Sequence, residues 1–113
     1  VASSFIITPP LAQMGFREHE AIEKGYDIKV AKLPAISIVR ARIEGDTRGF
    51  IKTVVDTKTN KILGCTLFCS GASEMINTIQ VAINCGLDYQ AVRDTIYTHP
   101  SMAEAFNDLY ALI

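Results

Sequence analysis

The spacing of apolar residues changes at Gly71, and this change restricts the possible folds more than any other feature of the chain. Before Gly71 the chain carries four β-rich runs close together, at residues 27–33, 35–44, 49–56 and 61–69. The last two runs are joined by the polar sequence DTKTNK, which is typical of a hairpin turn. Consecutive strands joined by short turns predict an antiparallel sheet.

Helical spacing follows Gly71, because apolar residues then recur every three or four positions until Gly86. Near the start of the chain, a β-rich run at residues 3–8 ends at two prolines, and an acidic helical pattern follows it. The predicted helices are residues 16–25, 72–85, 87–95 and 101–112. The order of elements predicts an α+β fold, with an antiparallel sheet flanked by helices.

Length and charge limit the classes of function. The 113 residues suit one domain, residues 1–113, and 49% of them are hydrophobic, enough for a core. The net charge of −1 gives no strong field to attract nucleic acid or an anionic membrane. The apolar runs are too short for a transmembrane helix, and no secretory leader is visible. Because the first residues, from Val1, already resemble the interior of a domain, we expect a piece of a longer protein.

The three cysteines are an odd number, which argues against a disulfide framework and favours the reducing cytoplasm. Cys65 and Cys69 are four residues apart, and on one strand their Cα atoms would be about 13 Å apart. That separation is too long for a disulfide. C-x3-C without nearby ligands is also a poor zinc signal, so no metal site is predicted. We expect all three, Cys85 included, to be small core residues.

His99 and Glu104 are the candidates for chemistry. An imidazole can take or give a proton near neutral pH, and a carboxylate on its other ring nitrogen fixes the tautomer. The stretch SMAE, from Ser101 to Glu104, also matches a capping box, in which Ser and Glu satisfy backbone N–H groups at a helix start. The two roles are compatible, and the local sequence leaves both open.

Other polar residues have simpler interpretations. His19 lies between two glutamates in a charged helix, so we expect it to be solvated rather than a ligand. Arg40 and Arg42 share one side of the predicted strand 35–44, where they could pair with carboxylates, meet a partner or form a half-exposed face. The chain has no G-x-G-x-x-G or G-x-x-x-x-G-K-[ST] phosphate motif, no G-x-S-x-G and no H-E-x-x-H.

Three stretches together resemble one family. THPSMAEAFNDL is similar to the C-terminal signature of the flavin-dependent pyridine nucleotide-disulfide oxidoreductases, such as glutathione reductase, dihydrolipoamide dehydrogenase and mercuric reductase. FIITPPLAQMGFREHEAIEKG resembles that family's entry into its interface domain. GFIKTVVDTKTNKILGCTLFCSGASEMIN resembles its sheet hairpin and the helix after it. The resemblance covers nearly the whole chain in the right order.

The resemblance implies an interface (dimerisation) domain whose parent forms a homodimer. His99 would be the acid-base residue reaching the partner subunit's redox cysteines, and Glu104 would orient it. Thr98, His99 and Pro100 would lie near the partner's flavin. The parent would use FAD and NAD(P)H bound by its other domains, so the isolated chain is expected to hold no cofactor and to be inactive. Self-association is expected through the helix 72–85 and the C-terminal segment.

Within the family, ARIEGDTRGFIKTVVD and SMAEAFNDLYALI are most similar to a bacterial branch linked to reactive-chlorine defence and metal-ion reduction. The implied substrate is a disulfide or a metal ion. The alternative from the residues alone is a free-standing α+β binding or oligomerisation module without catalysis, in which SMAE is only a helix cap.

Overall fold

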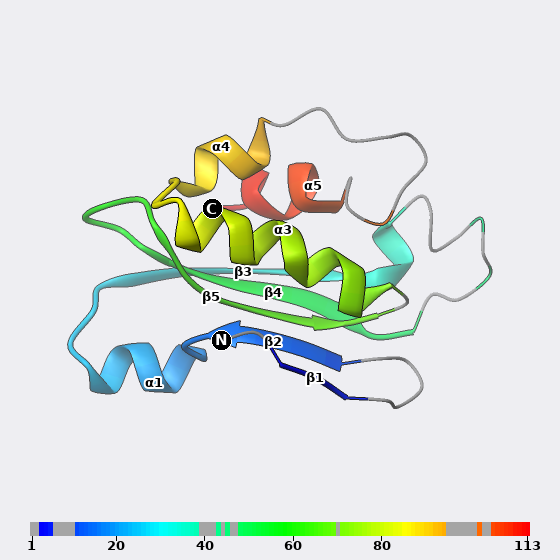
Figure 1. Ribbon diagram of the computed structural model, residues 1–113, viewed down its shortest axis with the longest axis horizontal. Helices are drawn as coiled ribbons and strands as arrows, with labels where there is room; N and C mark the ends of the chain where they lie inside the picture. The colour runs from blue at the N-terminus through cyan, green and yellow to red at the C-terminus, as the bar shows by residue number, and fades with distance from the viewer. Residues whose placement is uncertain are drawn as a thin grey trace.

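The computed structural model describes residues 3–5, 11–38, 43, 45, 48–69, 71–94, 102 and 105–113, with no side chains described for residues 3–5. Five antiparallel strands form one sheet in the order β1-β2-β5-β4-β3. The strands are β1 Ser3–Phe5, β2 Leu11–Gly15, β3 Ile28–Pro34, β4 Phe50–Asp56 and β5 Ile62–Phe68. The helices are α1 Glu18–Glu23, α3 Ala72–Asn84, α4 Tyr89–Arg93 and α5 Ala105–Ala111, with a 3-10 helix at Ala35–Ser37. The predicted α+β fold is confirmed (Figure 1).

The β4–β5 hairpin is formed by its turn chemistry, as predicted. The Asp56 carboxylate accepts hydrogen bonds from the backbone N–H of Lys58 and from the hydroxyl of Thr59, both at 3.0 Å. Asn60 takes the left-handed conformation with φ of 59°, which asparagine tolerates better than most residues. These contacts reverse the chain and set the register in which Phe50 pairs with Phe68.

The two faces of the sheet are covered unequally. Helices α3, α4 and α5 lie along one side, whereas in the described part of the chain the short α1 is the one helix against the other side (Figure 1). Alternate residues of β4 and β5, including Ile51, Val55 and Leu67, are buried in the core under the three helices. The core side of α3 consists of buried residues at helical spacing, namely Ala72, Met75, Ile76, Ile79 and Ala82. These residues confirm the helical pattern predicted after Gly71.

Strand β2 was not predicted, and α1 is shorter than the predicted helix 16–25. The sequence LAQMG lacks alternation because Ala12, Gln13 and Met14 are all buried, on both faces of the sheet. A central strand covered on both faces shows no period-2 signal. Because β2 ends only at Gly15, α1 begins at Glu18 rather than at the predicted residue 16.

The predicted strand 35–44 is wrong where the structure describes it. Residues Ala35–Ser37 form a 3-10 turn, and Ile43 is helical rather than extended. β3 ends at Pro34, which has no N–H to continue the ladder, and the Ala35 N–H donates to the Gly49 carbonyl at 3.0 Å. Arg40 and Arg42, placed on that strand from the sequence, lie outside the described residues.

Two facing glycines allow the chain to leave β2 and enter α1. Gly15 and Gly64 are direct partners in the β2–β5 register, and the Phe16 N–H donates to the Leu63 carbonyl at 2.9 Å. A Cβ on Gly64 would lie 1.8 Å from the Phe16 carbonyl oxygen. Gly15 has a positive φ of 72° and equally little room. Only glycine permits this close approach of two backbones.

Candidate functional site

The residues predicted to carry chemistry fall between two helices. Thr98, His99, Pro100 and Glu104 lie outside the described residues. The structure describes what precedes and follows them, since α4 ends at Arg93 and α5 begins at Ala105. The candidate site is therefore defined by the scaffold that holds the two ends of the segment 95–104.

Helix α5 is fixed to the sheet by a buried tyrosine. The Tyr110 side chain is fully buried, and its hydroxyl is hydrogen-bonded to the Thr53 hydroxyl of β4 at 2.8 Å. Its ring stacks at 6.3 Å on Tyr89 of α4 and lies 6.3 Å from Phe106. A buried hydroxyl needs such a partner, and this one also sets how far α5 sits from the sheet.

Helix α4 is fixed at its start to the β4–β5 turn. The Tyr89 N–H donates to the Asn60 carbonyl at 2.8 Å, and Asp88 caps the helix by accepting from the Ala91 N–H at 3.0 Å. The Asn60 that shapes the hairpin thus also holds α4. The predicted helix 87–95 is confirmed with shorter bounds.

The end of α4 is tied to α5. The Asn107 side-chain amide donates to the Arg93 carbonyl at 2.6 Å, joining the two helices next to the segment 95–104. Arg93 also makes a two-point contact with the neighbouring Asp94, with N–O distances of 2.8 and 3.1 Å. Through this hydrogen bond the pKa of Asp94 is lowered and that of Arg93 is raised. Sequence reasoning singled out neither Asn107 nor Tyr110.

The cysteines are free thiols, two buried and one exposed. Burial raises the pKa of Cys65 to about 12, although its hydrogen bond with Tyr110 lowers it in part, so the thiol stays protonated. The Cys69 thiol lies 3.7 Å from the Met75 sulfur in the core. The expectation that Cys85 is also a core residue is wrong, because it follows the last turn of α3 on its solvent side.

This difference predicts selective alkylation. In the folded chain, at concentrations that keep it monomeric, iodoacetamide is expected to modify Cys85 and to leave Cys65 and Cys69 unmodified, because these two thiols are buried out of reach of the reagent. Mass spectrometry after tryptic digestion measures the modification. Urea-unfolded protein, in which all three thiols should react, is the control. Early modification of Cys65 in the folded protein would contradict the buried placement.

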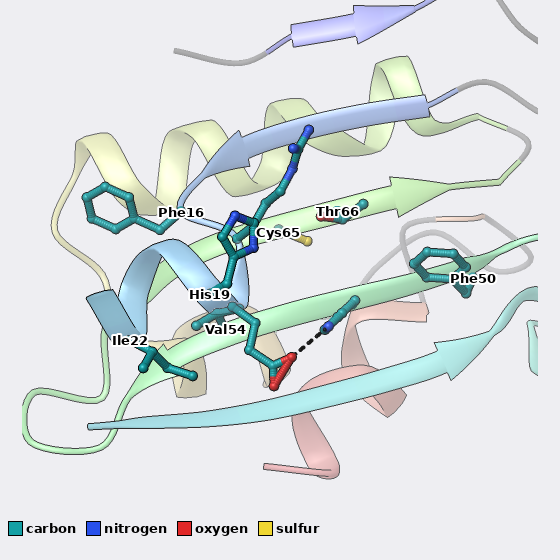
Figure 2. Close-up of a pocket in the computed structure, with 10 residues that line it drawn as sticks. Phe16, His19, Ile22, Phe50, Val54, Cys65 and Thr66 are labelled. Carbon is teal, nitrogen blue, oxygen red and sulfur yellow. Dashed lines mark hydrogen bonds and ion pairs between the residues drawn. The ribbon is translucent and has the colours of Figure 1, made fainter. Parts of the chain in front are cut away.

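A separate cavity of about 440 Å³ opens on the other face of the sheet, between α1 and the strands β4 and β5. Figure 2 shows His19 and Ile22 on α1 across from Phe50 and Val54 on β4. An ion pair at 3.1 Å joins Lys52 of β4 to Glu18 of α1. His19 is exposed at the cavity's rim, as expected from its charged neighbours.

Two features are absent from the described part of the chain. It contains no group of three or more His, Cys, Asp or Glu side chains placed to hold a metal ion. None of its helices is long and apolar enough to cross a membrane.

The chain is similar to known oxidoreductases. It is 47% identical over all of its 113 residues to the probable pyridine nucleotide-disulfide oxidoreductase RclA of Escherichia coli, of which it covers 26%. It is 35% identical over 97 residues, or 86% of the chain, to mercuric reductase of Bacillus cereus, of which it covers 15%. The chain thus spans about a quarter or less of the length of these relatives.

The fold agrees with the sequence match. The structure of the HOCl-induced flavoprotein disulfide reductase RclA from Escherichia coli superposes on the whole chain with a TM-score of 0.98. The chain covers 26% of that structure. The family model for the dimerisation domain of pyridine nucleotide-disulphide oxidoreductases matches residues 1–110. The chain therefore belongs to the pyridine nucleotide-disulphide oxidoreductase family and is its dimerisation domain.

Proposed function

We propose that this chain is the C-terminal interface domain of an FAD-dependent, NAD(P)H-linked oxidoreductase of the cytoplasm, and that it joins two subunits into a homodimer. The observation that carries the proposal is the family match over residues 1–110, with a 47% identical relative of which the chain covers only 26%. The sequence carries no dinucleotide-binding motif, so FAD and NAD(P)H would be bound by other parts of the parent. The isolated chain is expected to be inactive.

Within that parent, His99 acts as the acid-base residue and Glu104 orients its ring. FAD supplies the electrons for reduction when it is bound in the parent. Reducing a disulfide also requires protons, because the sulfur that leaves when the S–S bond breaks departs more readily if it receives a proton as it leaves. The His99 imidazolium gives that proton, and the neutral ring takes one back from the attacking thiol in the reverse direction. By the same proposal, Thr98, His99 and Pro100 would lie near the partner subunit's flavin.

The substrate class is a disulfide or a metal ion. RclA is described as a flavoprotein disulfide reductase and has been solved as a Cu(II) complex, and the other relative is named mercuric reductase. These names support both substrate types for the parent. The proton requirement distinguishes them, because a metal ion can accept electrons without a leaving thiolate to protonate. The acid-base role is tested by the turnover of a full-length His99→Gln variant.

Dimerisation is tested on the chain itself. The apolar side of α3 is used in the chain's own core, which leaves Val81, 58% exposed, as the large apolar residue on its solvent side. We expect sedimentation equilibrium to show a dimer, and Val81→Lys to raise the dissociation constant at least about tenfold, as for a central apolar contact. Ile22 on α1, also 58% exposed, is the matched control, and Ile22→Lys should leave the constant unchanged.

Two outcomes would count against this surface. A chain that stays monomeric at millimolar concentration would remove the support for association through this domain alone. Equal weakening by both lysine variants would mean that added charge, rather than the α3 surface, controls association.

A further inference from the structure

We propose that Asn107 is a positioning residue for His99, acting through the hydrogen bond that joins α4 to α5. The inference rests on the proposed acid-base function. Asn107 stands three residues after Glu104 in the sequence, and its amide donates to the Arg93 carbonyl at 2.6 Å. Arg93 is the last residue of α4. The bond therefore connects the two helices at the ends of the ten residues 95–104, among which His99 lies.

Each helix is held to the rest of the fold away from this point. The first residue of α4, Tyr89, is bonded to the β4–β5 turn through the Asn60 carbonyl at 2.8 Å. In α5, Tyr110 is bonded to Thr53 in the sheet at 2.8 Å. The Asn107 bond adds a contact between the two helices themselves, next to the segment that carries His99.

Short helices depend on such contacts for their direction. Helix α4 has five residues and α5 has seven, and helices of this length are not stable by themselves in water. Without the Asn107 bond, the end of α4 and the start of α5 would gain freedom relative to each other. A catalytic group whose support shifts by about 1 Å can lose roughly a hundredfold in rate. The predicted consequence is therefore a loss of activity through the placement of His99.

The simpler role for Asn107 is to satisfy a carbonyl at the C-terminal end of α4, which any helix leaves without an internal partner. That role would stabilise the fold without reference to His99. The two roles differ in one measurable respect. A positioning residue matters only while the group that it positions is present, whereas a stabilising residue matters equally in both backgrounds.

The experiment is a double-mutant cycle in the full-length parent, with Asn107→Ala, His99→Gln and the double variant. Steady-state disulfide turnover and flavin reduction by the nucleotide are both measured. Asn107→Ala is expected to lower disulfide turnover roughly 10- to 100-fold and to leave flavin reduction unchanged. In the His99→Gln background the same change is expected to alter turnover by less than about twofold. The limb of the pH–turnover profile that depends on His99 should also move in Asn107→Ala.

Thr57 provides a matched control. Its hydroxyl donates to the Asp27 carbonyl at 3.1 Å, a side-chain to backbone bond between distant parts of the chain. Thr57 lies in the β4–β5 turn that holds α4, but its backbone N–H also donates to Asp27, so the turn stays attached in the variant. Thr57→Val should leave turnover and its pH profile unchanged. Asn107→Ser, which keeps a shorter donor, should recover part of the lost activity, and it replaces Asn107→Ala in the cycle if that variant does not fold.

Two results would overturn the inference alone, with His99→Gln still strongly impaired. One is Asn107→Ala turnover within about twofold of the unmodified enzyme. The other is the same fold loss from Asn107→Ala in both backgrounds, which would assign Asn107 to stability only. If His99→Gln itself turned over disulfide at the normal rate, the proposed acid-base function would fail first, and the inference would fall with it.

Discussion

In the full-length parent, His99→Gln is expected to lower disulfide turnover by about 100- to 10,000-fold, the range that positioned acid-base groups contribute. Glutamine has hydrogen-bonding groups but cannot exchange a proton near neutral pH, so the thiolate leaving step loses its acid. Flavin reduction by the nucleotide should proceed at the normal rate, because it does not require this proton. Stopped-flow absorbance of the flavin and steady-state turnover measure the two steps separately.

The chain offers a matched control for that experiment. His19, its only other histidine, is exposed on α1 at the rim of the separate cavity. His19→Gln should leave turnover unchanged. Reduction of a metal ion by the His99→Gln enzyme should fall less than disulfide reduction, because no thiolate leaves. Normal disulfide turnover in His99→Gln would refute the acid-base role.

The second large effect is on stability. Gly64→Ala is expected to lower the free energy of unfolding by more than about 3 kcal/mol, because the new Cβ would lie 1.8 Å from the Phe16 carbonyl oxygen and 2.7 Å from its carbon. Both of these are backbone atoms, so the β2–β5 pairing itself would have to move. Urea unfolding of the isolated chain, followed by circular dichroism, measures the change.

Gly25→Ala is the control for that variant. Gly25 has a positive φ of 87°, but a Cβ added there would meet no atom within 4 Å, so only the backbone preference is affected. Its expected cost is about 1–2 kcal/mol, the usual penalty for a left-handed residue with a side chain. A Gly64→Ala variant no less stable than Gly25→Ala would contradict the close approach of Phe16 to β5.

The sequence predicted the elements whose causes are local. The β4–β5 hairpin depends on a turn in which Asp56 binds residues two and three positions later, so its signal is contained in DTKTNK. Helix α3 could also be predicted from the sequence, because its buried residues repeat at the helical period over 13 residues. In the last predicted helix, the apolar side expected from the sequence is Met102, Phe106, Leu109 and Ile113; the first three are buried and Ile113 is partly buried.

The features that the sequence analysis did not predict depend mainly on residues that are distant in the chain. β2 is a strand because β1 and β5 pair with its two edges. It was missed because its apolar and polar residues do not alternate. The break at Ala35–Ser37 depends on Pro34 and on the carbonyl of Gly49, 14 residues later than Ala35. Cys85 is exposed because it follows the last residue of α3 and is not among the residues with which this helix packs into the core.

The residues of the candidate site and its scaffold also fall into those with a local sequence signal and those whose partners are distant in the chain. His99 and Glu104 are proposed from a short motif and a family resemblance, both of which are visible in sequence. Asn107 and Tyr110 depend on partners 14 and 57 residues away, so nothing local marks them. A polar residue in a helix is usually a solvated one, and only the tertiary contact distinguishes Asn107 from its neighbours.

Among the described strands, β1 and β3 are the two edges of the sheet, and this has a consequence for the chain on its own. An open edge is a template for strand addition by another copy, which leads to aggregates. β3 carries exposed Lys29 and Lys32 and ends in Pro34, features that oppose edge-to-edge growth through charge repulsion and a missing N–H donor. Such an edge favours association through helices over polymerisation through strands.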